Sequence, residues 1–125
     1  ELDRQAVAQG LAQGAAHWVL LATHHPLVLV DCPWLDKDRI VGPLELMNWL
    51  NAASQQRLRG AVFGHAHQEV AGRVGAWPVF GVPSTCFQFR PRSPKFAIDD
   101  KGPGYQWLDL SKDGKISRTV RRVAV

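Results

Sequence analysis

No long apolar run occurs in this chain of 125 residues. The longest candidate, residues 18–30, is interrupted by two histidines and a proline, so it stays short of the roughly 18 consecutive apolar residues that a membrane-spanning helix needs. The N-terminal stretch also has no signal-peptide pattern, which would combine a basic start with an apolar centre. We therefore expect a protein without a membrane partner, located in the cytoplasm.

Cysteine is scarce, and so are dense groups of one charge. The two cysteines, Cys32 and Cys86, lie far apart and match no zinc or redox spacing, so reduced thiols are expected. Basic residues outnumber acidic ones by 15 to 11, but no basic motif interleaved with aromatic residues accompanies them. This scatter favours a solvated surface over a nucleic-acid interface, so we expect no nucleic-acid partner.

The apolar pattern predicts an α/β domain spanning residues 1–125. Helical spacing of apolar residues predicts two helices, over residues 1–16 and 44–58. Short continuous apolar runs at residues 18–22 and 61–63 predict strands, and the first run suits a strand buried on both faces.

The second half of the chain reads mainly as β-structure. Alternating patterns around two glycines predict C-terminal hairpins, with strands at residues 69–74, 77–82, 105–110 and 115–123. Residues 27–43 and 83–104 hold most of the eight prolines and are predicted to be loops or irregular structure.

Four of the five histidines follow the two short predicted strands directly. His24 and His25 come after the first strand, and His65 and His67 come after the second. The carboxyl ends of neighbouring strands meet at one sheet edge, where ligands bind in open α/β sheets. His65 and His67 are two residues apart and would point to the same side of an extended backbone. Because imidazole is a common ligand for divalent metals, we interpret His24, His65 and His67 as metal ligands.

Residues beside these histidines are candidates for supporting roles. Adjacent residues at a strand end point in opposite directions, so we choose His24 as the ligand and assign His25 to ligand support or substrate contact. Gln68 can orient a ligand histidine. Ser84 and Thr85 can line the site, although a structural turn explains them equally well. His17, the remaining histidine, is interpreted as an ordinary structural residue.

The segment Thr23-His24-His25-Pro26, followed by Gly64-His65-Ala66-His67, resembles the last two sequence blocks of the calcineurin-like metallophosphoesterases. Later segments narrow the resemblance to the bacterial class III cyclic-AMP phosphodiesterases; they are residues 34–36, 83–89, 96–100 and 103–110. The resemblance implies a four-layer α-β-β-α sandwich with two metal ions at the sheet edge. It also implies that His24 and His65 share one metal, while His67 binds the other.

Three further blocks of that family do not occur in this chain: Asp-x-His, Gly-Asp and Gly-Asn-His. None of the 11 glycines is followed by Asp or Asn. The resemblance therefore implies that residues 1–125 form the C-terminal half of the catalytic domain, whose partner is the missing N-terminal half. Because a half-sandwich exposes apolar sheet surface, we expect the isolated segment to self-associate and to be inactive.

By resemblance, the complete protein hydrolyses 3′,5′-cyclic AMP to 5′-AMP with a hydroxide activated by two divalent ions, which are iron, manganese or zinc. Two other interpretations fit the same residues. One is a non-catalytic domain in which His24, His65 and His67 hold a single zinc ion. The other is a basic module that binds nucleic acid.

Overall fold

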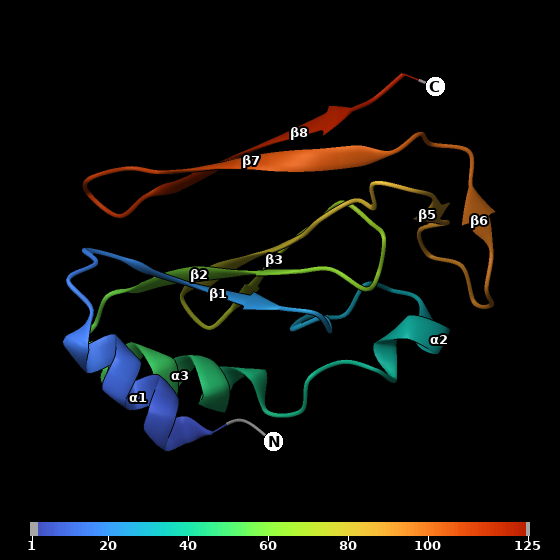
Figure 1. Ribbon diagram of the computed structural model, residues 1–125. Coiled ribbons are helices and arrows are strands. Elements are labelled where there is room, and N and C mark those ends of the chain that lie inside the picture. The colour runs from blue at the N-terminus through green and yellow to red at the C-terminus, as the bar shows by residue number, and fades with distance from the viewer. Residues whose placement is uncertain (1–2, 125) are drawn as a thin grey trace.

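A computed structural model describes residues 3–124 (Figure 1). Residues 1 and 2 of the first predicted helix lie outside this described part. In chain order the elements are α1 (Arg4–Gln13), β1 (Val19–Thr23), α2 (Pro33–Asp36), α3 (Pro43–Ala53), β2 (Leu58–Phe63), β3 (Val70–Val74), β4 (Trp77–Gly81), β5 (Gln88–Phe89), β6 (Ile98–Asp99), β7 (Gly104–Leu110) and β8 (Ile116–Arg122).

The structure has three layers. Four strands form a mixed sheet in the order β1-β2-β4-β3, in which β1 and β4 run parallel to β2 and β3 runs antiparallel to β4. Helices α1 and α3 cover one face of this sheet, and the antiparallel β7–β8 ribbon lies over the other face (Figure 1). The predicted α/β class, mixed sheet and C-terminal hairpins are thus confirmed.

A capping hydrogen bond and a change of backbone conformation set where α1 begins and where α3 ends. The Asp3 carboxylate accepts a hydrogen bond of 3.0 Å from the Ala6 amide and so caps the start of α1. Helix α3 ends at Ala53, five residues before the predicted end, because Gln55 and Gln56 adopt left-handed φ values of 53° and 65°. The short helix α2 was not predicted, since a single turn is too brief to show helical periodicity.

Strand β1 lies at the edge of the sheet, and the prediction that it is buried on both faces is wrong because none of its residues is fully buried. Within residues 3–124 it pairs only with β2, and its residues are half-buried except for the exposed Ala22. A groove of about 870 Å³ runs beside it between α1 and α3, lined by residues such as Val7, Leu21 and Leu46. The apolar run of β1 is therefore only partly covered by the described residues.

Arg118 of β8 is one of the residues that hold the β7–β8 ribbon to the sheet. Its guanidinium lies over the Phe80 ring, 5.0 Å from the centroid, and donates a 2.7 Å hydrogen bond to the Val70 carbonyl oxygen. The same guanidinium lies 3.7 Å from the Glu69 carboxylate. These contacts place β7 and the loop before it beside the sheet edge where β2 ends.

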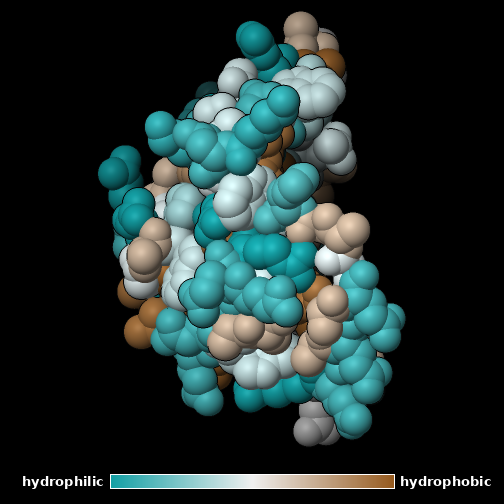
Figure 2. Space-filling model, turned by 90° about the vertical axis from the view of Figure 1, so that its left-hand side faces the viewer, coloured by the Kyte–Doolittle hydropathy of each residue, from teal (hydrophilic) through white to brown (hydrophobic). Residues whose placement is uncertain are grey.

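The surface is mixed in character. Figure 2 shows the end of the molecule with the β7–β8 turn and the helices, where hydrophilic residues predominate and hydrophobic residues appear between them. The large exposed apolar residues are Leu29, Val41, Leu44, Phe87, Phe96, Ile98, Tyr105, Trp107, Leu110 and Val123. Among the described residues, no helix has the length and apolar character to cross a membrane.

Candidate metal centre

The two histidine groups lie side by side at one edge of the sheet. Parallel pairing aligns Thr23 at the end of β1 with Phe63 at the end of β2. A 3.4 Å hydrogen bond from the Gly64 amide to the Thr23 carbonyl oxygen continues this pairing past both strands. The prediction that neighbouring strands deliver both histidine groups to the same edge is confirmed.

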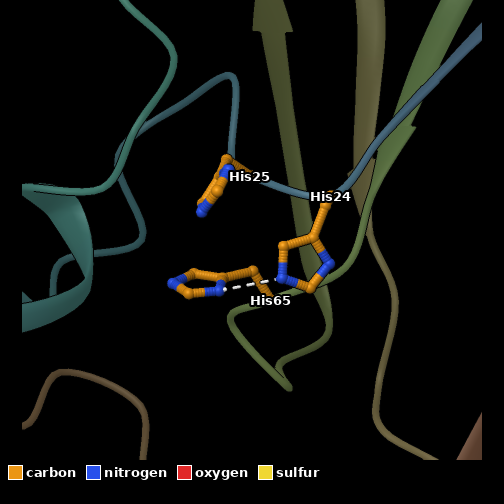
Figure 3. A group of neighbouring side chains, drawn as sticks. All are labelled: His24, His25 and His65. Carbon is orange, nitrogen blue, oxygen red and sulfur yellow. Dashed lines mark hydrogen bonds between the residues drawn. The ribbon is translucent and has the colours of Figure 1, made fainter.

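His24 and His65 face each other across this edge (Figure 3). The distance between His65 Nδ1 and His24 Nε2 is 3.2 Å. Two imidazole nitrogens bound to one tetrahedral zinc ion at about 2.05 Å stand about 3.3 Å apart, which is close to this spacing. The pair can therefore share a metal ion with little movement of either ring.

His25 joins this pair, which differs from the sequence-based expectation. One ring nitrogen from each of His24, His25 and His65 lies within 4.8 Å of the others, and the ring centroids of His25 and His65 are 4.7 Å apart. The rule that adjacent residues point oppositely fails because the chain bends immediately after β1. Thr23 stabilises the bend, since its hydroxyl donates a 2.9 Å hydrogen bond to the His25 carbonyl oxygen. We call these three residues the histidine cluster.

His65 and His67 do not lie on the extended backbone that was expected, although both line the same cavity. Their φ values are 53° and 50°, in the left-handed region that few residues other than glycine adopt. A hydrogen bond of 2.5 Å from the Ala66 amide to the Gly64 carbonyl oxygen closes a three-residue turn around His65. Backbone strain of this kind is concentrated at functional sites, and here it turns the two imidazoles toward different neighbours.

Asp38 orients the His65 ring from the other side. The Asp38 carboxylate lies 3.4 Å from His65 Nε2 and accepts its hydrogen, which leaves Nδ1 unprotonated and directed at His24. Burial lowers the pKa of His65 below 6.5; the nearby His25 and His24 lower it further, while Asp38 opposes the shift. The net lowering of this pKa favours a neutral imidazole, which is the form that binds metal.

His67 is held by a different set of groups. Its Nδ1 lies 3.0 Å from the Phe87 carbonyl oxygen, which only accepts hydrogen bonds, so Nδ1 carries the proton. Its ring stacks on Phe89 with centroids 4.5 Å apart and an interplanar angle of 13°. In the neutral ring the lone pair is then on Nε2. Metal-binding histidines commonly donate their other ring N–H to a backbone carbonyl in this way.

A cavity of about 360 Å³ joins the predicted site residues. It is lined by His24, Gly64, His65, His67, Val82, Pro83, Ser84, Thr85, Gly104 and Tyr105. The structure therefore brings Ser84 and Thr85 to the same cavity as all three predicted ligands. Its volume lies within the range of roughly 300–1,000 Å³ that is typical of small-molecule sites.

Gln68 lies behind this cavity and is buried. Its side-chain amide donates a 3.4 Å hydrogen bond to the sulfur of Cys32, which is also buried. This contact directs the Gln68 amide toward the core under α2. The predicted role of Gln68 in orienting a ligand histidine stays a prediction.

The loop that carries Ser84 is fixed by Gln88, a residue that the sequence analysis did not single out. Gln88 is 2% exposed; its Oε1 accepts a 3.0 Å hydrogen bond from the Ser84 amide, and its Nε2 donates at 2.8 Å to the Ser84 carbonyl oxygen. Asp38 and Phe89 were likewise missed as partners of the histidines. Only their places in the fold reveal these roles, because each acts over a long sequence separation or through the backbone.

Comparison with known proteins reveals relatives that are named as cyclic nucleotide phosphodiesterases. The chain is 37% identical over 105 residues to a probable cyclic nucleotide phosphodiesterase of Psychrobacter arcticus, which covers 83% of this chain and 37% of the relative. It is 36% identical over 106 residues to the 3′,5′-cyclic adenosine monophosphate phosphodiesterase CpdA of Pseudomonas aeruginosa, covering 85% of this chain and 38% of that protein. The same enzyme of Escherichia coli K12 is 35% identical over 108 residues, with coverages of 86% and 38%.

The chain thus spans about two fifths of the length of the curated relatives that it matches. No family model matches the chain.

Proposed function

We propose that this chain is the C-terminal part of a metal-dependent phosphodiesterase that hydrolyses 3′,5′-cyclic AMP to 5′-AMP. The observation that carries the proposal is the convergence of His24 and His65 from two adjacent strand ends, with nitrogens 3.2 Å apart. The relatives named as cyclic nucleotide phosphodiesterases support the substrate class, because their similarity extends over more than four fifths of this chain.

In this proposal His24 and His65 bind one divalent ion, and His67 binds a second ion through Nε2. Two such ions, when bound, would lower the pKa of a bound water and polarise the phosphoryl oxygens. The residues of this chain position the ions: Asp38 holds the His65 ring, and the Phe87 carbonyl oxygen and the Phe89 ring hold His67. In the net reaction, water adds to phosphorus, the bond from phosphorus to O3′ breaks, and O3′ takes up the proton.

The remaining ligands would come from a preceding segment of the same protein. In residues 3–124 the histidine cluster includes no carboxylate, whereas a dinuclear phosphoesterase centre needs bridging oxygen ligands. The open edge of β1 and the groove of about 870 Å³ beside it offer the surface where that segment would add strands. The four-layer sandwich would then be complete, and self-association of the isolated segment is a consequence of the same open surface.

The experiment is an assay of the full-length protein with 3′,5′-cyclic AMP, before and after removal of metal with a chelator. We expect 5′-AMP as the product, loss of activity without metal, and recovery with manganese, iron or zinc. His24→Ala should abolish hydrolysis and remove the ion that His24 shares with His65, while His17→Ala, at an exposed site away from the cavity, should leave metal content and hydrolysis unchanged. Full hydrolysis by the metal-free protein would overturn the proposal.

A second candidate function is a non-catalytic domain with one zinc ion. It is favoured by one observation, which is that His24, His25 and His65 alone offer three nitrogens within 4.8 Å of one another. Metal stoichiometry separates the two candidates. A single ion per full-length chain that is lost in His25→Ala and retained in His67→Ala would support this second candidate.

A further inference from the structure

The cavity beside the histidines is also lined by residues that the metal proposal does not use. The proposed metal ligands His24, His65 and His67 line it, and Gly104 and Tyr105 at the start of β7 line it as well. Tyr105 is the only tyrosine of the chain and supplies the only phenyl or phenol ring among the residues that line this cavity. Its side chain is therefore placed to meet any molecule whose charged end is bound by the histidines.

The backbone holds Tyr105 firmly at this position. The Gly104 amide donates a 2.8 Å hydrogen bond to the Ser84 carbonyl oxygen, which also accepts from Gln88. A side chain at Gly104 would begin 3.0 Å from Pro83 Cγ, so the start of β7 lies tight against the Ser84 loop. Because strand residues alternate in direction, the buried Gly104 faces inward and Tyr105 faces outward beside the cavity.

The Tyr105 ring is exposed and available for stacking. The residue is 41% exposed, and its ring meets Trp107 in an edge contact with centroids 6.3 Å apart. Arg121 lies opposite Tyr105 in the register of the ribbon, so a cation accompanies the ring on the same surface. Phe87, the other exposed aromatic residue near the histidines, packs against His67 at 5.1 Å and does not line the cavity.

We infer that the ring of Tyr105 is a stacking platform for the base of a nucleotide whose phosphate is bound at the histidines. The inference rests on the proposed function and adds a subsite to it. A cyclic nucleotide carries its charge at one end and a flat aromatic base at the other, which matches a cavity that is lined by imidazoles and bordered by the exposed Tyr105. An aromatic side chain can stack on any nucleotide base. This subsite therefore favours nucleotides over other phosphodiesters but does not distinguish one base from another.

The test compares two substrates in the metal-loaded full-length protein: 3′,5′-cyclic AMP and ribose 3′,5′-cyclic phosphate, which lacks the base. Tyr105→Leu should raise KM for cyclic AMP by about 5- to 150-fold, the range that follows from the loss of one base–aromatic stack. KM for the base-free substrate should not change, which also shows that the variant is folded. Tyr105→Phe keeps the ring and should behave as the wild type.

Trp107→Leu is the matched control, because Trp107 is an exposed ring on the same face of β7 and does not line the cavity. It should leave KM for both substrates unchanged. An unchanged KM for cyclic AMP in Tyr105→Leu, or an equal rise for both substrates, would overturn the subsite while the proposed function stands. A wild-type protein that hydrolyses neither substrate would overturn the proposed function, and the subsite with it.

Discussion

His65 and His67 are only two residues apart and share an unusual backbone, yet their surroundings differ in kind. His65 lies among polar and ionisable groups, with two imidazoles and the Asp38 carboxylate around it. His67 lies on an aromatic surface, stacked on Phe89 and bonded to a backbone carbonyl oxygen. The left-handed residues on either side of Ala66 therefore place the two histidines of one short sequence motif in different surroundings. This division is what two separate metal ions would require.

The largest expected effect comes from removing either imidazole in the full-length protein. His65→Ala and His67→Ala should each weaken binding of their own metal ion by more than about 100-fold, since loss of a supporting residue already costs 10- to 100-fold. Metal analysis of the purified variants, paired with activity on cyclic AMP, measures this. If the His67→Ala variant still binds two ions per chain, His67 is not a ligand. His65 and His67 then do not mark two separate metal sites.

Acid should weaken metal binding at both positions. Protons compete with metal for neutral imidazoles, so affinity should fall as the pH drops below about 6.5, by up to tenfold per pH unit for each competing ring. Because burial lowers the pKa of His65, this ring begins to compete at lower pH than an ordinary histidine. Metal titrations at several pH values measure the slope, and equal affinities on both sides of that pH would contradict the ligand assignment.

His25→Ala should have an intermediate effect that is confined to the His65 side. His25 contacts His65 with ring centroids 4.7 Å apart, so its loss should loosen that ring and weaken the first metal site by about tenfold. Calorimetric titration can measure this, with His17→Ala as a matched control that should not differ from the wild type. Complete loss of metal in His25→Ala would instead make it a ligand, as the single-zinc interpretation requires.

Phe89→Leu should act on the His67 side alone. It removes an aromatic stack of roughly 0.5–1.5 kcal/mol, so affinity at the second metal site should fall by about two- to tenfold. Leucine keeps most of the apolar contact with Trp34, which limits the structural disturbance. A loss of metal from the first site as well would show that the two positions are coupled rather than separate.

The smallest change is expected for Asp38→Asn. The carboxylate raises the pKa of His65 through its hydrogen bond and its charge, so its removal should lower that pKa further. NMR titration of the histidine ring protons in the metal-free full-length protein can follow this directly. A higher pKa for His65 in the variant would show that Asp38 does not orient the ring in the way inferred here.

The sequence was sufficient for features that depend on local pattern. Apolar runs predicted β1 and β2, and the placement of His24 and His65 after them predicted that both reach one sheet edge. The C-terminal hairpin followed from alternation around Gly114, whose φ of 84° suits a turn. These features are set by neighbouring residues, which is why a single chain reveals them.

Features that depend on tertiary contacts could not be predicted in the same way. Burial of β1 on both faces was expected from its composition, but how far its side chains are covered depends on which elements pack against its two faces. The left-handed backbone at His65 and His67 has no signal in the residue type, because the surrounding packing imposes it. The hydrogen bond between Asp38 and His65, which lie 27 residues apart, likewise exists only once their loops have converged.

The shared ion is tested most directly by anomalous diffraction at the absorption edge of the bound metal, from crystals of the metal-loaded full-length protein. We predict one peak about 2.0–2.2 Å from a ring nitrogen of both His24 and His65, and a second peak at the same distance from Nε2 of His67. A fully occupied peak bound by none of these nitrogens would contradict this assignment.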